Sequence, residues 1–192
     1  MILESIVTTV DQDGLVNVAP MGPIVDGPML TEFTLRPYHS STTCKNLLSS
    51  RQATIHVTDD AGLFARSAVS RVRSDDLVSS MADSVGPGYW RLKSCHRWFA
   101  VRVNDVTGGD PLYQMSTAVL AQGVDRPFFG FNRAKHAIIE ASILATRTHL
   151  LPPEKILADL DGLRVAVEKT AGREDRETFD WLCDRVRAKM KS

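Results

Sequence analysis

Hydroxyl side chains gather directly after an arginine in residues 36–43, which read Arg-Pro-Tyr-His-Ser-Ser-Thr-Thr. Arg36 ends a run with strand character, and Ser41, Thr42 and Thr43 begin a short segment with helical character. A helix N-terminus attracts phosphate, hydroxyls donate to its oxygens, and arginine adds a charge-assisted contact. Serine and threonine also cap helices that bind nothing, and an arginine at a strand end is commonly solvated. The segment therefore leaves two alternatives open: a phosphate site, or a plain cap with Ser41 as N-cap.

A second candidate site is the break in the strand pattern at residues 20–23, Pro-Met-Gly-Pro. We expect the preceding strand, residues 15–19, to leave its ladder here, because proline cannot donate and glycine accepts unusual dihedrals. Exposed backbone groups at such a break can bond the edge of a flat heterocycle, and Met21 offers a polarisable surface to its face. A barrel corner that binds nothing would have the same pattern, so this segment alone decides nothing.

Composition excludes several classes of protein. The 192 residues carry 23 basic and 23 acidic side chains, so no global positive field attracts nucleic acid or an anionic membrane. The three cysteines are widely spaced without a Cys-x-x-Cys pair, which fits reduced thiols rather than disulfides or zinc. The N-terminus lacks a basic, apolar leader, and no apolar stretch approaches the length of a bilayer span. We therefore expect a cytoplasmic protein that binds neither nucleic acid nor membrane.

Motifs for several kinds of chemistry are missing from the sequence. The five histidines show no metal-ligand spacing, so we expect no metal site. Gly-x-Ser-x-Gly, Walker and Gly-x-Gly-x-x-Gly patterns are also absent, which gives hydrolase, NTPase and Rossmann folds no support. No general acid, base or nucleophile stands out, and the catalytic residues stay unknown at this point.

The first part of the chain has the period-two pattern typical of strands. The β-branched runs 2–10 and 15–19 flank a turn cluster that ends at Gly14 and predict a hairpin. The pattern predicts further strands over five ranges: 29–36, 53–58, 89–92, 98–106 and 112–123. A short helix after Ser41 and another over 61–69 interrupt them, and the weakly periodic residues 71–88 predict an irregular excursion.

After Pro127 the hydrophobic period changes from 2 to 3.6, which indicates helices. Asn132 can cap the first of them, and two more follow the double proline at 152–153 as an antiparallel hairpin. Arg133 lies on a polar stripe of the first helix, either a surface ion-pair stripe or, with Asn132, an approach to a partner's ligand. The predicted fold class is α+β, with a strand-rich domain over 1–131 and a C-terminal helical segment over 132–192 packed on it as a cap.

Four short motifs follow one another in the order typical of the FMN-binding split-barrel superfamily. They are Glu4-Ser-Ile-Val-Thr-Thr9, Asn17-Val-Ala-Pro-Met-Gly22, Ser41-x-Thr43-x-x-Asn46-Leu47 and Phe131-Asn-Arg-Ala134. The chain resembles a branch of unknown function within that superfamily, which also holds flavin reductases and pyridoxamine-phosphate oxidases. The resemblance covers residues 2–60 and 128–150. It implies a six-stranded Greek-key split β-barrel and a homodimer that binds FMN in the groove between its subunits.

The resemblance also assigns roles to individual residues. It places cofactor contacts at eight positions: Pro20, Met21, Gly22, Arg36, Ser41, Thr42, Thr43 and Asn46. The first three would line the flavin ring, the next four would hold the phosphate, and Asn46 matches the asparagine of the motif, where it can simply tie loop to helix. Cys44 stands where an aromatic residue is common and His56 where asparagine is, so their roles stay open.

The implied function is a flavin-dependent oxidoreductase, similar to flavin reductases, that passes hydride or electrons from a reduced nicotinamide to an acceptor. Flavin chemistry often needs no protein acid or base, because the ring itself carries the hydride. One alternative is a non-catalytic module on the same fold that binds a ligand or a protein partner. Another is a barrel that holds a deazaflavin or haem instead of FMN. The arginine and hydroxyl cluster favours the flavoenzyme, because an interaction module has no use for it.

Overall fold

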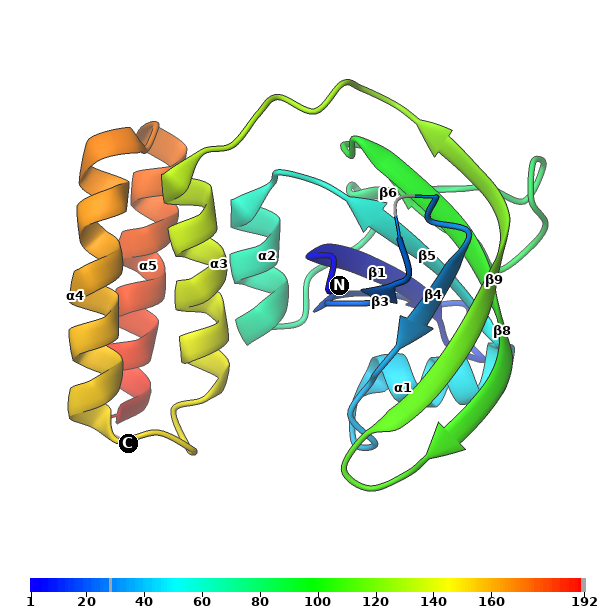
Figure 1. Cartoon of the computed structure of the whole chain (residues 1–192), viewed down its shortest axis with the longest axis horizontal. Helices are drawn as coiled ribbons and strands as arrows, with labels where there is room; N and C mark the ends of the chain where they lie inside the picture. The colour runs from blue at the N-terminus through cyan, green and yellow to red at the C-terminus, as the bar shows by residue number, and fades with distance from the viewer. Residues whose placement is uncertain (28, 191–192) are drawn as a thin grey trace. The chain divides into compact units, whose positions relative to one another are not determined.

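The computed structural model describes residues 1–27 and 29–190 and has the expected α+β class, with a curled antiparallel sheet and C-terminal helices (Figure 1). Residues 191 and 192, the last two of the expected helical segment, lie outside the described residues. The chain forms two compact units. The barrel unit consists of Met1–Thr58 and Val72–Phe128, and the helical unit consists of Asp59–Arg71 and the chain from Phe129 onward.

Seven strands of the barrel unit form one antiparallel sheet in the order β2-β1-β5-β8-β9-β4-β3. Their bounds are β1 (Ser5–Val10), β2 (Val16–Met21), β3 (Ile24–Val25), β4 (Glu32–Leu35), β5 (Gln52–Val57), β8 (Arg97–Gly108) and β9 (Tyr113–Val124). The sheet curls until β3 meets the start of the chain, where Leu3 N–H donates to Pro23 O at 3.0 Å and Val25 N–H donates to Met1 O at 2.8 Å. These bonds close the barrel, while the outer edge of β2 has no strand partner among the described residues.

The barrel encloses an apolar core, because alternate residues of each strand point inward. Phe33 of β4 and Phe99 of β8 are buried side by side, with ring centroids 5.0 Å apart. Helix α1 (Thr42–Ser50) adds Cys44 and Leu47 to this core, and both are fully buried. The helix contacts β1 and β2 and hydrogen-bonds to Thr9 and Asn17, so it packs at the end of the barrel where β1 finishes and β2 begins.

Residues 72–96 cover part of the outer face of the barrel sheet. They contain β6 (Val78–Ser80) and β7 (Trp90–Leu92), which pair as a small separate sheet inside the excursion predicted to be irregular. Thr8 Oγ1 of β1 donates to Trp90 O at 2.6 Å, and the imidazole of His56 accepts from Leu92 N–H at 3.1 Å. Polar groups on the outer face thus fasten this second layer.

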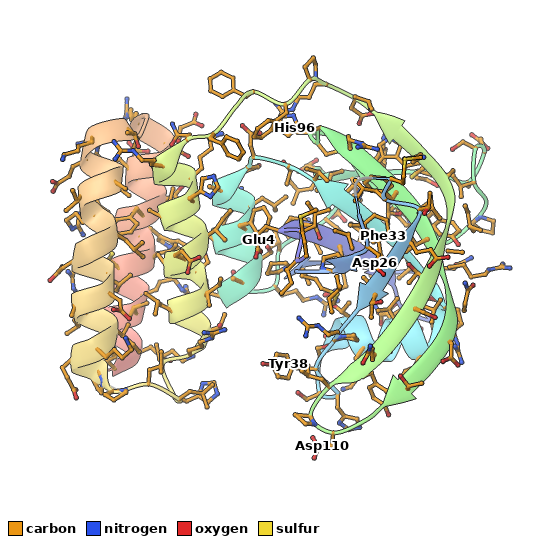
Figure 2. All side chains as sticks on the ribbon, viewed as in Figure 1. Glu4, Asp26, Phe33, Tyr38, His96 and Asp110 are labelled. Carbon is orange, nitrogen blue, oxygen red and sulfur yellow. The ribbon has the colours of Figure 1, made fainter. Side chains whose placement is uncertain are left out.

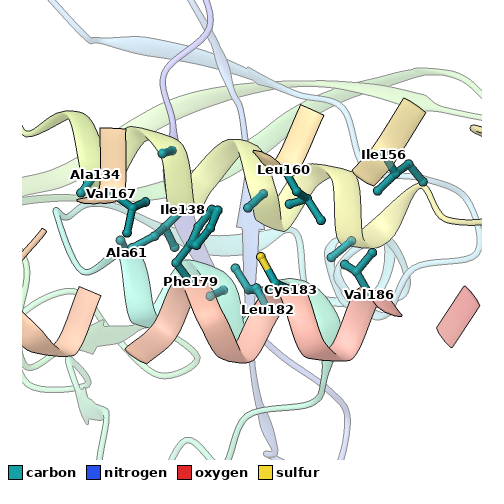
Figure 3. Close-up of a cluster of buried hydrophobic side chains, with 14 residues drawn as sticks. Ala61, Ala134, Ile138, Ile156, Leu160, Val167, Phe179, Leu182, Cys183 and Val186 are labelled. Atoms are coloured by element: carbon teal, nitrogen blue, oxygen red, sulfur yellow. The ribbon is translucent and has the colours of Figure 1, made fainter. Parts of the chain in front are cut away.

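The helical unit is a bundle of four helices, α2 (Ala61–Val69), α3 (Arg133–Thr146), α4 (Pro153–Thr170) and α5 (Arg173–Met190). Helix α3 contacts each of the other three. Buried side chains from all four helices form its core (Figure 3), among them Ala61, Ala134, Ile138, Ile156, Leu160, Val167, Phe179, Leu182, Cys183 and Val186. No helix among residues 1–27 and 29–190 combines the length and apolarity that a bilayer span requires.

Two sequence-based boundaries differ from the structure. The division at residues 131 and 132 left 59–71 with the barrel, whereas these residues join the helical unit because Ala61 and Ala65 are buried in its core. Strand β2 was expected to stop at residue 19, yet Pro20 and Met21 continue it. An edge strand tolerates proline, since the missing N–H need not face a neighbour. The sheet also has seven strands, one more than the resemblance implied.

Candidate functional site

The N-terminus of α1 is the first element of the candidate site. Ser41 caps it in an extended conformation (φ −75°, ψ 150°), and its Oγ accepts from Cys44 N–H at 3.1 Å. Thr42 begins the helix and is exposed, and the first turn holds no acidic side chain. The positive end of the helix dipole is therefore not neutralised locally and can attract an anion. The predicted cap is confirmed, and the phosphate role of Ser41 and Thr42 stays a prediction.

The connection from β4 to α1 is held by hydrogen bonds to two backbone carbonyls. Tyr38 O accepts from Ser41 N–H at 3.0 Å and from Ser41 Oγ at 2.8 Å, and His39 N–H donates to Pro111 O at 3.0 Å. Figure 2 shows Tyr38 at the same end of the barrel as the β8–β9 turn. Arg36 enters this connection with an exposed side chain, and none of the ion pairs among the described residues includes it. Arg36 thus lies six residues before Thr42, the first residue of α1, and its guanidinium is available to a ligand.

Thr43 and Asn46, two further positions assigned by the resemblance, are buried and hydrogen-bonded to the sheet. Asn17 Nδ2 of β2 donates to Thr43 Oγ1 at 3.0 Å, and Asn46 Nδ2 donates to Thr9 Oγ1 of β1 at 3.0 Å. Both side chains are only 4% exposed, so these bonds anchor α1 to the sheet. The Thr43 hydroxyl keeps its own proton to donate.

Cys44, which lies between Thr43 and Asn46 in the sequence, is buried. Burial raises the pKa of its thiol and leaves it a poor nucleophile.

Pro20, Met21 and Gly22 lie at the far end of β2 from α1. The Met21 side chain packs against the barrel core, and a Cβ on Gly22 would meet the Ile2 side chain at 2.6 Å. A larger residue here would have to displace the Ile2 side chain, so glycine allows the chain start to pass close to the end of β2. Met21 lies four residues after Asn17, which is beside α1, and this span of strand is about 13 Å long. The two candidate segments thus occupy opposite ends of the unpaired β2 edge.

His56, whose role the sequence left open, is a structural brace. It is fully buried on β5, its Nδ1 lies 3.0 Å from Ile6 O, and its Nε2 accepts from Leu92 N–H at 3.1 Å. A carbonyl can only accept and an N–H can only donate, so the neutral ring carries its proton on Nδ1. Burial lowers the pKa of His56 to about 4, against the opposing effect of the Ile6 hydrogen bond. His56 therefore joins β1, β5 and β7 and lies beneath residues 90–92.

Asn132 and Arg133 belong to the helical unit. Asn132 caps α3, because its Oδ1 accepts from Ala134 N–H at 2.9 Å and Lys135 N–H at 3.2 Å, and its Nδ2 donates to Thr170 O at 3.1 Å. The predicted cap is confirmed. Arg133 is the exposed first residue of the helix. Its alternative role beside a partner's ligand stays a prediction.

Arg97 is a residue that the sequence did not single out. It begins β8 on the face that carries Phe99, and its guanidinium carbon lies 4.9 Å from the centre of the Phe99 ring. One guanidinium nitrogen donates to Gln122 Oε1 at 3.2 Å. An arginine two residues before a buried phenylalanine in a strand signals an inward cation, and the alternation of Phe99, Val101 and Val103 was visible in the sequence.

In the described part of the chain, no group of three or more His, Cys, Asp or Glu residues could hold a metal ion.

The arrangement of the two candidate segments suits an elongated organic anion. An anionic group would lie at Arg36 and the start of α1, and a flat ring would lie near Met21.

Comparisons with solved structures identify the same fold. An FMN-bound protein from Methanosarcina mazei is 22% identical, with a TM-score of 0.82 over 96% of this chain and 94% of that one. An FMN-binding protein from Thermus thermophilus is 13% identical, with a TM-score of 0.52 over 64% of this chain and 71% of that one. The flavin reductase of the styrene monooxygenase from Pseudomonas putida S12 is 14% identical, with a TM-score of 0.51 over 65% and 82% of the two chains. These likenesses show the split-barrel fold.

Two family models match the sequence itself. The model described as the N-terminal domain of a protein of unknown function (DUF447) matches residues 3–126, and the model described as protein of unknown function (DUF447) matches residues 132–184. The two matches follow the barrel sequence and the C-terminal helices in turn. A split barrel followed by three helices, matched along almost its whole length, makes this chain a member of the DUF447 family.

Proposed function

We propose that this chain binds FMN and works as a flavin-dependent oxidoreductase similar to flavin reductases, in a homodimer whose intersubunit groove holds the cofactor. The observation that carries the proposal is an acid-free helix N-terminus, six residues after exposed Arg36 in the sequence, at one end of an unpaired strand edge. The M. mazei relative is FMN-bound and the T. thermophilus protein is FMN-binding, which favours FMN as the elongated anion.

Each element has a distinct task in this proposal. Thr42 and Arg36 hold the phosphate, because they combine a hydroxyl donor with a guanidinium that forms no ion pair among the described residues. Ser41 shapes this helix N-terminus, since its hydroxyl proton goes to Tyr38 O and its Oγ accepts from Cys44 N–H. The segment 20–22 lines the ring along the edge of β2. Thr43 and Asn46 keep α1 at the sheet, and Thr43 can add its hydroxyl proton. Bound FMN would supply hydride or electron transfer between a reduced nicotinamide and an acceptor.

A titration with FMN tests the proposal and its placement together. We expect the double variant Arg36→Ala/Thr42→Ala to weaken FMN binding by about 100-fold or more, since each charge-assisted hydrogen bond contributes about 1.5–3 kcal/mol. The control Lys93→Ala/Ser94→Ala removes one charge and one hydroxyl from exposed positions elsewhere on the barrel unit and should bind FMN as the wild type does. Equal dissociation constants for both variants would place the phosphate elsewhere.

Further measurements separate the proposal from its alternatives. Light scattering should give twice the 21.2 kDa of one chain, and a monomer that retains FMN would contradict the dimer. Preference for a deazaflavin or haem over FMN would change the cofactor. An FMN-loaded protein that fails to oxidise reduced nicotinamides would favour the non-catalytic module. We also propose a cytoplasmic location, which the three free, buried cysteines favour.

A further inference from the structure

Arg97 is a cation against the apolar core of the barrel, and it forms no ion pair in the described part of the chain. Its side chain is half-buried, stacks on Phe99 and has a single hydrogen-bond partner, Gln122. Its Nε is buried and finds no acceptor. None of the ion pairs among the described residues includes Arg97.

This arrangement is costly for the protein alone. A buried donor without an acceptor, here Nε, destabilises the fold, and a charge partly removed from water is stabilised by a partner or a compensating field. Buried polar groups in native proteins are nearly always satisfied, so an exception calls for a partner from outside the chain. An anionic or negatively polarised group would satisfy Nε and the charge together.

The position of Arg97 relates it to the segment proposed to line the flavin ring. Arg97 is the first residue of β8 and pairs with Val57, the last residue of β5. Met21 is the last residue of β2 and pairs with Ser5, the first residue of β1. The register of β1 with β5 aligns these two pairs, so all four residues lie at the barrel end opposite α1. Met21 and Val57 pack against the same core that Phe99 helps to form.

We propose that Arg97 stabilises the reduced cofactor, because its guanidinium lies where it can offset the negative charge that the flavin ring gains on reduction. The inference rests on the proposed FMN binding. A hydride from a reduced nicotinamide brings two electrons and one proton to the ring, and the nicotinamide becomes its oxidised, positively charged form. The ring is left with one extra negative charge. A cation near it favours the reduced state and leaves the oxidised, neutral ring nearly unaffected.

The test compares the affinity of the protein for the two redox forms of FMN. Anaerobic titrations measure the dissociation constants of oxidised and dithionite-reduced FMN for the wild type, Arg97→Gln, Arg97→Lys and Arg102→Gln. Arg102 is the matched control, because it lies on the same strand with an exposed side chain on the opposite face. Equilibration with a redox dye checks the ratio of the two constants independently.

We expect Arg97→Gln to weaken binding of reduced FMN at least tenfold more than binding of oxidised FMN. Arg97→Lys should restore most of this difference, which also keeps the test valid if the glutamine variant folds poorly. Arg102→Gln should leave the ratio within twofold of the wild type. An unchanged ratio in Arg97→Gln with FMN still bound would overturn the inference and leave the proposed function standing. Failure of the wild type to bind either form would overturn both.

Discussion

The brace at His56 makes the stability of the barrel depend on pH in a calculable way. The unfolded chain protonates this imidazole near its ordinary pKa of 6.5, whereas burial holds the folded pKa at about 4. Between these values the unfolded state binds the extra proton, so stability falls as the pH is lowered. At about 1.4 kcal/mol per pH unit, the neutral buried ring contributes about 3 kcal/mol that is fully present above pH 6.5 and lost toward pH 4.

Substitution His56→Gln removes the titration, and the comparison with wild type isolates it. At pH 7 we expect the variant to be less stable by about 1–3 kcal/mol, because at least one buried backbone group loses its partner. Toward pH 4 the wild type alone loses about 3 kcal/mol through this group, so the advantage of the wild type in free energy of unfolding should vanish or reverse.

The assay is denaturant unfolding at a series of pH values in a Trp181→Phe background. Fluorescence then reports only on Trp90 and Trp98, both in the barrel unit. His39→Gln, which removes an exposed imidazole from the same unit, serves as the control. A free-energy difference between wild type and His56→Gln that stays constant from pH 7 to pH 4 would refute the buried, neutral brace.

Three other predictions concern stability and assembly. Arg51 ends α1 in the left-handed region (φ 59°), so Arg51→Gly should raise the free energy of unfolding by up to about 1 kcal/mol; a loss of stability would contradict this. Truncation after Leu151 removes α4 and α5, exposes the apolar faces of α2 and α3, and should lower solubility or the melting temperature. Any soluble truncated dimer should retain FMN by absorbance, because the proposed phosphate and ring contacts precede Leu47; loss of FMN from a folded dimer would assign the helices to the site.

Local signals in the sequence predicted much of the secondary structure. The hairpin around Gly14, the Ser41 and Asn132 caps and the helix over 61–69 all occur in the structure, since each depends on turn residues, capping side chains or a short apolar period. Local signals do not predict which elements a helix packs against. Ala61 and Ala65 show which face of α2 is buried but not that its partners follow some 70 residues later.

Strand register is the other property that local patterns do not contain. The contacts of His56 with Ile6 and Leu92 depend on how distant strands align, and a shift by one residue would reverse the faces of a strand. The same holds for Asn17 and Thr43, whose hydrogen bond gives an expected phosphate ligand a further role as an anchor for α1. Residue types thus indicated the candidate site, and only the fold distinguished its exposed members from its buried ones.

The visible absorption spectrum of freshly purified protein, recorded before and after gel filtration, tests the central claim most directly. The account predicts the two-band spectrum of an oxidised flavin that coelutes with the protein, and release of FMN, without a covalent bond, when the protein is denatured. A colourless protein that also fails to take up added FMN would contradict the proposed function.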